Sequence, residues 1–206
     1  MKPDYRNWVP KYILYLLGFF AALCCLAAMI LQWTLHDGTT KAILSSVLLV
    51  AGILLTAAFL WMARMYRAFS YDGKRKLSKD IVEGIAGYVK VPENGLALDV
   101  GCGSGALTIA VAKRNPSALV IGVDRWGKEY ASYNKSLCEK NAKAEGVHRV
   151  EFREGDAVQL DFPDESFDAV VSNYVYHNIT GVDRQQVLLE TLRVLKKGGS
   201  FALHDI

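Results

Sequence analysis

The eight residues Leu98-Asp99-Val100-Gly101-Cys102-Gly103-Ser104-Gly105 decide the fold of this chain. An apolar run precedes the acid, three glycines follow at alternate positions, and the helix-like stretch 106–113 comes next. This order predicts a strand, a tight turn and the start of a helix. Glycine lets a ligand approach the main chain closely, and a helix N-terminus favours negatively charged groups. The stretch therefore predicts a ligand-binding turn between a strand and a helix.

Further strand-like segments follow the glycine turn. Residues 118–124 are predicted to be a second buried strand that ends in Asp124, 19 residues after Gly105. An acid at that place can accept hydrogen bonds from both hydroxyls of a ribose. The remaining predicted strands are 149–153, 169–173 and 200–205. Because strands and helix-like segments alternate, we expect an α/β fold, a Rossmann-like doubly wound parallel sheet with its ligand at the carboxyl ends of the strands.

The pattern resembles the class I S-adenosylmethionine-dependent methyltransferases, whose motif I is such a glycine turn. Its spacing, Gly-x-Gly-x-Gly, differs from the dinucleotide fingerprint Gly-x-Gly-x-x-Gly. The resemblance runs from about Leu77 to the last residue and implies S-adenosylmethionine as the cofactor. It implies these cofactor-binding residues: Asp99, Gly101, Cys102, Gly103, Gly105, Asp124, Arg125, Trp126, Asp156, Ala157 and Asn173.

Two members of this set have particular expected roles. Trp126 offers an aromatic face for the adenine ring, and the resemblance places Asp156 at the adenine amino group. Ordinary structural roles are the alternatives. The glycines would then form a plain strand-to-helix turn, Asp124 a solvated strand end, Trp126 a packing residue and Asp156 a helix cap.

The segment that follows the fourth predicted strand, Asn173-Tyr174-Val175-Tyr176-His177-Asn178, is expected beside the transferable methyl group. His177 is a candidate general base, with a polar pocket-wall residue as the alternative. Tyr176 is a candidate for shaping the acceptor pocket or bonding an acceptor oxygen, with packing as the alternative. Amino-methylating relatives often carry Asn/Asp-Pro-Pro-Tyr/Phe here, so the departure argues against DNA or an amide nitrogen as the acceptor.

Two uncharged stretches, Tyr12–Leu31 and Ala42–Ala63, precede this domain and contain 20 and 22 residues. Each is long enough to cross a bilayer as a helix, and the short connection predicts an antiparallel transmembrane hairpin. A cleaved signal peptide and buried core helices are the alternatives. The predicted domains are the hairpin at 1–68, a linker at 69–77 and the methyltransferase domain at 78–206. Small residues on shared helix faces predict close helix packing, namely Gly18 with Ala22 and Gly52 with Thr56.

Basic residues flank the hairpin at its two outer ends, whereas the connecting turn has only Lys41. We therefore expect a multi-pass protein of the cell membrane, with both termini and the methyltransferase domain in the cytoplasm. Residues 71–206 carry 18 basic and 19 acidic side chains, so no nucleic-acid partner is predicted. The four cysteines form no Cys-x-x-Cys pair, and we expect no metal site.

Helix boundaries follow from capping patterns. Ser78 is expected to cap a helix that reaches Tyr88, and a second helix is expected over 128–144. Asp183 is expected to open a helix that Lys196 and Lys197, with the glycines after them, would close.

The sequence stops at the fifth predicted strand, whereas relatives of this fold continue with one more helix and a pair of strands. We expect either a fragment or a partner, including a second copy, on the exposed edge of that strand. The predicted function is membrane-anchored transfer of a methyl group from S-adenosylmethionine to a small, apolar or lipid-like acceptor. The alternatives are a non-catalytic cofactor-binding membrane module or inactive fragment, and a nicotinamide-dependent oxidoreductase.

Overall fold

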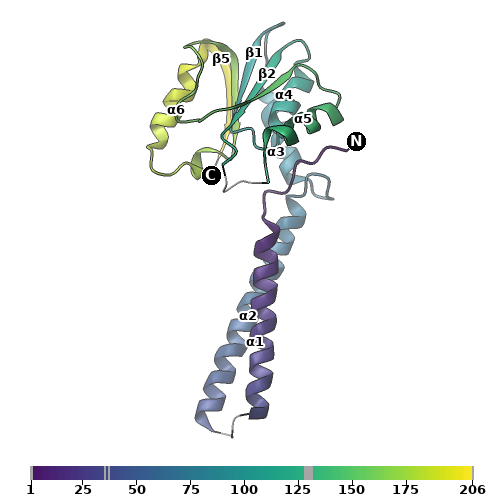
Figure 1. The fold of residues 1–206 in the computed structure, drawn as a ribbon, viewed down its shortest axis with the longest axis vertical. Coiled ribbons are helices and arrows are strands. Elements are labelled where there is room, and N and C mark those ends of the chain that lie inside the picture. The colour runs from purple at the N-terminus through teal and green to yellow at the C-terminus, as the bar shows by residue number, and fades with distance from the viewer. Residues whose placement is uncertain (1, 35, 37, 128–131, 206) are drawn as a thin grey trace. The chain divides into compact units, whose positions relative to one another are not determined.

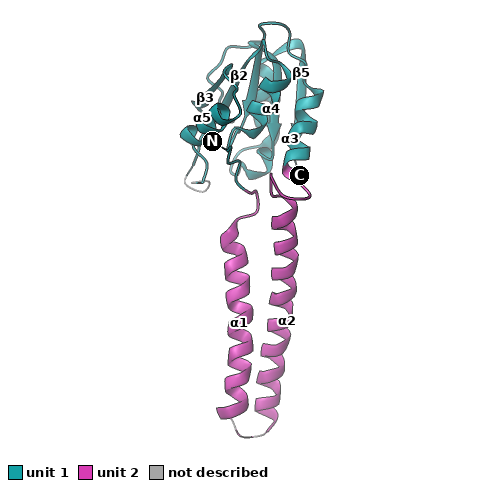
Figure 2. Cartoon of the chain, turned by 90° about the vertical axis from the view of Figure 1, so that its right-hand side faces the viewer, with its two compact units in different colours: residues 1–6, 79–206 teal, residues 7–78 magenta. Residues whose placement is uncertain are grey.

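A computed structural model of the chain describes residues 2–34, 36, 38–127 and 132–205. The chain forms two compact units, one of residues 7–78 and one of residues 1–6 together with 79–206 (Figure 2). The first unit contains the two apolar stretches, and the second contains the glycine turn.

The apolar stretches form two long helices, α1 (Lys11–Thr34) and α2 (Thr39–Ala68), side by side in an antiparallel hairpin (Figure 1). Both are long and apolar enough to cross a membrane by length and composition. Large apolar side chains along both helices point outward; Phe19 is 61% exposed and Leu54 is 64% exposed. A continuous apolar surface of this kind suits hydrocarbon better than water. The predicted pairing of two apolar helices in a hairpin is confirmed, and its insertion into a membrane remains a prediction.

Small residues bring α1 and α2 together. Gly52 is buried, and a Cβ atom placed there would lie 3.5 Å from Cβ of Cys24. A Cβ atom at Gly18 would lie 3.6 Å from the ring of Phe59. Ala21 is buried and the predicted Ala22 is exposed, so Gly18 shares the contact face of α1 with Ala21 and not with Ala22. One residue corresponds to about 100° of rotation around a helix, which sequence spacing alone defines poorly.

The second unit is a five-stranded parallel sheet in the order β3-β2-β1-β4-β5, with helices packed on it (Figure 1). The predicted Rossmann-like α/β fold is confirmed. The strands are β1 (Leu96–Val100), β2 (Leu119–Asp124), β3 (Val150–Glu154), β4 (Phe167–Asn173) and β5 (Leu195–His204). The helices are α3 (Leu77–Tyr88), α4 (Ala106–Arg114), α5 (Lys135–Ala144), α6 (Arg184–Arg193) and the 3-10 turn η2 (Tyr176–Asn178).

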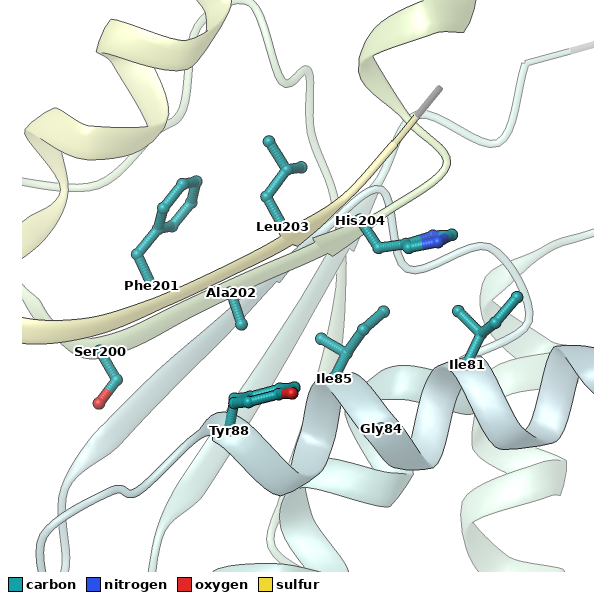
Figure 3. Close-up of a pocket in the computed structure, with 9 residues that line it drawn as sticks. All are labelled: Ile81, Gly84, Ile85, Tyr88, Ser200, Phe201, Ala202, Leu203 and His204. Carbon is teal, nitrogen blue, oxygen red and sulfur yellow. The ribbon is translucent and has the colours of Figure 1, made fainter.

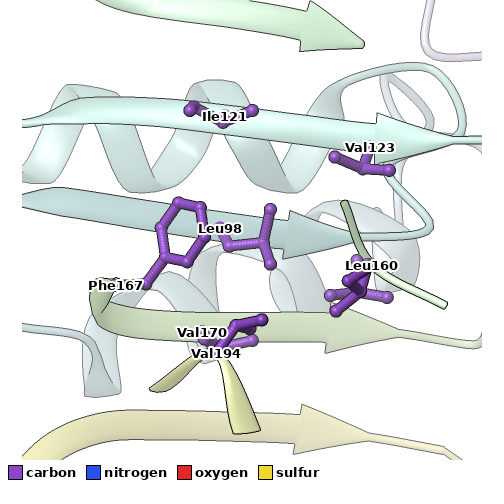
Figure 4. Packing of buried hydrophobic residues seen from close by; sticks show 8 residues of the cluster. Leu98, Ile121, Val123, Leu160, Phe167, Val170 and Val194 are labelled. Carbon is purple, nitrogen blue, oxygen red and sulfur yellow. The ribbon is translucent and has the colours of Figure 1, made fainter. Parts of the chain in front are cut away.

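The core of this unit lies between the sheet and the elements that cover it. Leu98, Val170 and Val194 are completely buried, and Phe167 is 1% exposed (Figure 4). Continuous apolar runs of this kind are typical of parallel strands covered on both faces. Among the described residues β5 pairs only with β4, and Phe201 and Leu203 on β5 are 36% and 40% exposed. The carboxyl ends of all the strands meet at one edge of the sheet, and this edge positions the site.

Three predicted helix boundaries are wrong. Ser78 does not cap α3, because its Oγ donates to the carbonyl of Phe69 at 2.8 Å. Residues 128–131 of the helix predicted over 128–144 lie outside the described residues, and α5 begins only at Lys135. Asn134 caps α5, since its Oδ1 accepts a hydrogen bond from the backbone nitrogen of Leu137 at 2.9 Å.

The end of α6 is the third difference. Asp183 caps the start of α6 as predicted, with Oδ1 accepting from the backbone nitrogen of Gln185 at 3.0 Å. The helix ends at Arg193, before the predicted Lys196. Lys196 lies in β5, where its Nζ donates to Oδ1 of Asp168 at 2.7 Å. Lys196, which was predicted to lie at the end of the helix, therefore forms an ion pair with Asp168 in the sheet instead.

The N-terminal residues also differ from the expected grouping with the hairpin, because they lie against α5. The backbone nitrogen of Asp4 donates to Oδ1 of Asn141 at 2.7 Å, and Nδ2 of Asn141 donates to the carbonyl of Asp4 at 2.9 Å. Tyr5 is 5% exposed, and its hydroxyl donates to Oε1 of Glu145 at 3.1 Å. Residues 4–5 thus form part of the α/β unit.

Candidate functional site

The glycine turn connects β1 to α4. The backbone nitrogens of Gly101 and Cys102 donate to the carbonyl of Val123 at 2.7 and 3.0 Å, which ties the turn to β2. Gly101, Gly103 and Gly105 all have positive φ, at 75°, 54° and 79°. Such backbone angles are costly for any residue with a Cβ atom.

The glycines differ in their surroundings. A Cβ atom at Gly101 would lie 2.2 Å from Cγ2 of Val175, so both the backbone angle and the available space require glycine. Among the described residues, a Cβ atom at Gly103 would meet nothing within 4 Å. The turn is therefore closed at Gly101 and open at Gly103, which leaves main chain accessible to a ligand.

Asp124, at the end of β2, is hydrogen-bonded to the open part of the turn. Its Oδ2 accepts from the backbone nitrogen of Gly103 at 2.8 Å, and its Oδ1 accepts from the backbone nitrogen of Trp126 at 2.7 Å. A carboxylate offers about four lone-pair sites, so about two remain for hydroxyl donors. The two backbone bonds also orient the carboxylate.

Trp126 bonds back to the same turn. Its indole Nε1 donates to the carbonyl of Gly103 at 3.0 Å, and its φ of 41° is unusual for a residue other than glycine. The structure therefore brings Gly103, Asp124 and Trp126 into one hydrogen-bonded group, which we call the turn cluster. Gly103 and Trp126 are 23 positions apart in the sequence.

Asp99 lies beneath the turn. Its side chain is 1% exposed, and its Oδ2 accepts from the hydroxyl of Thr108 at 2.6 Å. Burial raises the pKa of the Asp99 carboxyl to about 7, against the lowering effect of the Thr108 hydrogen bond and with a smaller contribution from the charge of Asp124. The side chain of Asp99 is almost completely buried and accepts a hydrogen bond from Thr108 of α4. It therefore presents almost no surface to a cofactor, and the expected direct contact does not fit this position.

Cys102 is similarly turned inward. It is 7% exposed, and a Cβ atom at Gly122 of β2 would lie 3.0 Å from its Sγ. Burial, together with the neighbouring Cys138, raises the pKa of the Cys102 thiol. The thiol of Cys138 itself donates to the carbonyl of Gly103 at 3.2 Å. The thiol of Cys102 therefore lies in the interior of the α/β unit.

The turn after β3 contains Asp156 and Ala157. Oδ1 of Asp156 accepts from the backbone nitrogen of Val158 at 2.9 Å, an Asx-type turn, and the side chain is exposed. Ala157 packs against the hydrophobic core. Arg125 is exposed beside Asp124.

A second group of polar and aromatic side chains lies where β4 and β5 end. Oδ1 of Asn173 lies 3.1 Å from Nδ1 of His204, and Nδ1 of His177 lies 2.5 Å from Oδ1 of Asp205. The ring of Tyr174 contacts both imidazoles edge-on, with centroid distances of 5.6 Å to His177 and 5.0 Å to His204. We call these five residues the strand-end cluster. Val175, within the same segment, faces Gly101, so this segment abuts the glycine turn.

Tyr176 points away from the strand-end cluster. It is 6% exposed, and its hydroxyl lies 2.6 Å from Oγ1 of Thr191 on α6. Burial raises the pKa of the Tyr176 hydroxyl. Its surroundings correspond to packing, the alternative to an acceptor-contacting role, and the candidate catalytic role of Tyr176 is not carried forward.

An apolar groove lies between α3 and β5 within the α/β unit (Figure 3). Ser200, Ala202 and His204 point toward α3, whereas Phe201 and Leu203 point toward the opposite face of the strand (Figure 3). The rest of the lining comes from α3, namely Ile81, Gly84, Ile85 and Tyr88. The groove ends at His204, which also bonds Asn173, so it borders the strand-end cluster.

Little or nothing in the sequence indicated the roles of three residues that organise this region. Tyr174 carried no pattern beyond its place after a strand, and Asp205 carried only its place at the end of β5. Asn141 lies in the middle of α5, where no local signal marks it, yet its Nδ2 donates to the carbonyl of Ser104 at 3.0 Å. Of the three, only Asp205 has a sequence signal, as an acid at the carboxyl edge of a parallel sheet.

The parallel sheet, the glycine turn and the acid at the end of β2 define a class of proteins, the Rossmann-like methyltransferases. The family model described as a methyltransferase domain matches residues 98–203, and the chain belongs to this family. The match begins in β1 and ends in β5, so it covers the turn cluster and most of the strand-end cluster.

Individual proteins give the same result. The chain is 38% identical over 116 residues to a demethylmenaquinone methyltransferase of Lactobacillus johnsonii, an alignment that covers 56% of this chain and 45% of that protein. It is 30% identical over 149 residues to the 27-O-demethylrifamycin SV methyltransferase of Amycolatopsis mediterranei, covering 71% of this chain and 52% of that protein. The chain spans about half the length of the curated relatives it matches.

Among solved structures, the chain is similar to a putative S-adenosyl-L-methionine-dependent methyltransferase from Methanococcus maripaludis. The TM-score is 0.50 at 25% sequence identity, and the similarity covers 61% of this chain and 53% of that one.

Proposed function

We propose that this chain is a membrane-anchored methyltransferase that uses S-adenosylmethionine to methylate a small apolar acceptor of the quinone type. The turn cluster is the observation that carries the proposal. It presents an open glycine main chain, a carboxylate with acceptor sites left over and an indole, all at the carboxyl edge of a parallel sheet. Ligands of such sheets bind at that edge.

The residues present fit this cofactor. The space above Gly103, which a Cβ atom would enter without contact, admits a ligand against the main chain. Asp124 would hold the ribose hydroxyls with its remaining lone pairs, and Trp126 would face the adenine ring. Asp156, Ala157, Arg125 and Asn173 border the same edge of the sheet and complete the proposed cofactor set.

When bound, S-adenosylmethionine supplies an electrophilic methyl carbon. The protein's task is then to orient the acceptor and exclude water, which can contribute about 7–11 kcal/mol in favourable cases. His177, which follows β4 and is partly accessible, would accept a proton from an acceptor that carries one at its reacting atom.

The acceptor class rests on the helical hairpin and on the relatives. Two helices that can span a bilayer would keep the enzyme where apolar molecules accumulate. One relative is named for a demethylated menaquinone and another for a demethylated rifamycin, and the quinone type of acceptor proposed here follows the first of these names.

Turnover tests this proposal. The full chain would be reconstituted in lipid vesicles that contain demethylmenaquinone and incubated with S-adenosylmethionine carrying a tritium-labelled methyl group. Label that extracts into organic solvent with the quinone supports the proposal. Label found only in aqueous compounds contradicts the acceptor class. Cofactor binding without any transfer would indicate the non-catalytic module, and absence of binding would contradict the proposal as a whole.

The membrane orientation is a separate part of the proposal. Arg64 and Arg67 at the end of α2 and Lys11 at the start of α1 place the positive charge at one end of the hairpin, which predicts that both termini are cytoplasmic. A membrane-impermeant maleimide should label Thr40→Cys in intact cells and should label Lys74→Cys only after permeabilisation. The unsubstituted chain is the control for its own cysteines, and the reverse labelling pattern would overturn the orientation.

A further inference from the structure

Asp205 contacts His177, the candidate general base predicted from the sequence. Its Oδ1 lies 2.5 Å from Nδ1 of His177, and the two side chains are 14% and 23% exposed. Its Oδ2 accepts a hydrogen bond from the backbone nitrogen of Tyr176 at 2.7 Å. The carboxylate is thus held by the main chain on one side and meets the imidazole on the other.

This contact selects the state of the imidazole. An ionised carboxylate only accepts hydrogen bonds, so Nδ1 of His177 must carry the proton. In the neutral ring the lone pair then lies on Nε2, because the partner of one ring nitrogen decides which nitrogen is protonated. The ring of Tyr174, edge-on at a centroid distance of 5.6 Å, packs against the same imidazole.

We propose that Asp205 is a positioning residue, which holds His177 with Nδ1 protonated and Nε2 available as the proton acceptor in methyl transfer. The inference rests on the proposed function and extends it from a candidate base to a His177–Asp205 pair. It concerns acceptors that carry a proton at the reacting atom, since only these need a base.

Methyl transfer forms one bond, breaks one bond and releases one proton. The nucleophilic atom of the acceptor forms a bond to the methyl carbon, and the sulfur of the donor keeps the electron pair of the broken carbon–sulfur bond. The acceptor's proton passes to Nε2 of His177. The resulting imidazolium lies beside the carboxylate of Asp205. The proton leaves to water after product release, so the pair returns to its starting state.

A purely structural role for Asp205 is the competing explanation, because the same carboxylate binds the backbone of Tyr176. The two roles differ in what they predict. A structural role affects stability, whereas a positioning role determines the imidazole tautomer and the turnover number of the folded enzyme.

Nitrogen-15 NMR of the full chain in detergent micelles, with label only in histidine, tests the tautomer without cofactor or turnover. The chain has four histidines, and the His177→Gln variant identifies the signal of His177. We expect the pattern of a ring protonated at Nδ1 in the unsubstituted chain. In Asp205→Ala we expect that pattern to be lost. A ring already protonated at Nε2 in the unsubstituted chain would overturn the proposal.

Kinetics supplies the second readout. We expect Asp205→Ala to lower kcat by about 10²-fold with little change in KM, and Asp205→Glu to recover part of the loss. Asp205→Asn keeps an acceptor for the Tyr176 backbone and should still lower kcat, which separates positioning from support. Asp164→Ala, which alters an exposed ion pair with Arg193, is the matched control and should leave the tautomer and kcat unchanged.

The results can be read independently of the proposed function. If the unsubstituted chain transfers no methyl group, the proposed function fails, and the NMR spectrum still decides whether Asp205 sets the tautomer. If transfer occurs and Asp205→Asn retains full kcat, the positioning role is wrong although the proposed function stands.

Discussion

Oδ1 of Asn141 accepts a hydrogen bond from the backbone nitrogen of Asp4 at 2.7 Å, across 137 residues of sequence. The amide nitrogen of the same side chain donates both to the carbonyl of Asp4 and to the carbonyl of Ser104 in the glycine turn. Asn141 is 2% exposed. One buried amide therefore joins the N-terminal residues, α5 and the proposed cofactor turn.

Replacing Asn141 by leucine should destabilise the chain and weaken cofactor binding. The change removes the amide that bonds the backbone of Asp4 and leaves the buried carbonyl of Ser104 without this donor, which costs about 1–3 kcal/mol. Thermal unfolding of the full chain in detergent, with and without S-adenosylmethionine, measures both effects. Lys140→Ala changes the exposed neighbouring residue and should behave like the unsubstituted chain. An unaltered melting temperature for Asn141→Leu would show that the contacts contribute nothing.

Asp124→Ala should reduce affinity for S-adenosylmethionine by about 5- to 150-fold, the equivalent of about 1–3 kcal/mol for lost hydrogen bonds to a charged group. The substitution would also remove the hydrogen bonds that join Asp124 to the backbones of Gly103 and Trp126, so the turn cluster would lose two of its internal contacts. Calorimetric titration of the full chain measures the affinity. Glu139→Ala removes an exposed acid from α5 and is the control. Equal affinities in all the proteins would remove Asp124 from the binding site.

Two alanine substitutions in the glycine turn should differ in their main effect, one on stability and the other on cofactor binding. Gly101→Ala drives a methyl group into Val175, 2.2 Å away, and should cause mainly a loss of stability. The methyl group of Gly103→Ala meets no atom of the part of the chain that the structure describes, so its stability loss should be limited to the backbone cost of about 1–2 kcal/mol. Its methyl group would, however, occupy the space proposed for the cofactor.

Melting temperatures and titrations of both variants test this difference. Adding Val175→Ala to Gly101→Ala should restore part of the stability, because it removes the obstructing methyl groups. If Gly103→Ala binds S-adenosylmethionine as tightly as the unsubstituted chain, the cofactor does not lie over Gly103.

Asp99 should make stability depend on pH. Its pKa in the folded chain is about 7, above the usual 3.8, so the folded state binds this proton more tightly than the unfolded state does. The resulting stabilisation is present in full below about pH 4 and is lost as the pH rises toward about 7. The loss amounts to about 4 kcal/mol for a shift of this size in a fully buried group.

Asp99→Asn cannot ionise and should not show this loss. The melting temperature of the variant, relative to that of the unsubstituted chain, should therefore rise between about pH 5 and about pH 8. Measuring both proteins side by side cancels the titration of their other groups. A difference that stays constant over this range would mean that Asp99 titrates normally.

The sequence by itself determined the fold and the helical hairpin. Apolar runs such as 118–124, an acid at a strand end and alternate glycines are local patterns, which predict strands and tight turns without reference to distant contacts. The positive φ values of Gly101, Gly103 and Gly105 are the structural counterpart of that spacing. The hairpin follows equally locally, from length and hydropathy. The roles of individual cofactor residues remain predictions.

Only the tertiary structure decided which side chains meet. Asp205 reaches His177 across 28 residues, Trp126 bonds to the carbonyl of Gly103 across 23, and Tyr176 is turned into the core by Thr191. Such pairings depend on the order and register of the parallel strands, which bring remote strand ends to one edge of the sheet. Asp99 and Asp124 both lie at or near the end of a strand, yet Asp99 is buried whereas Asp124 is partly exposed. The tertiary structure decides this difference. Side-chain direction at a strand end depends on packing, and packing has no short sequence signal.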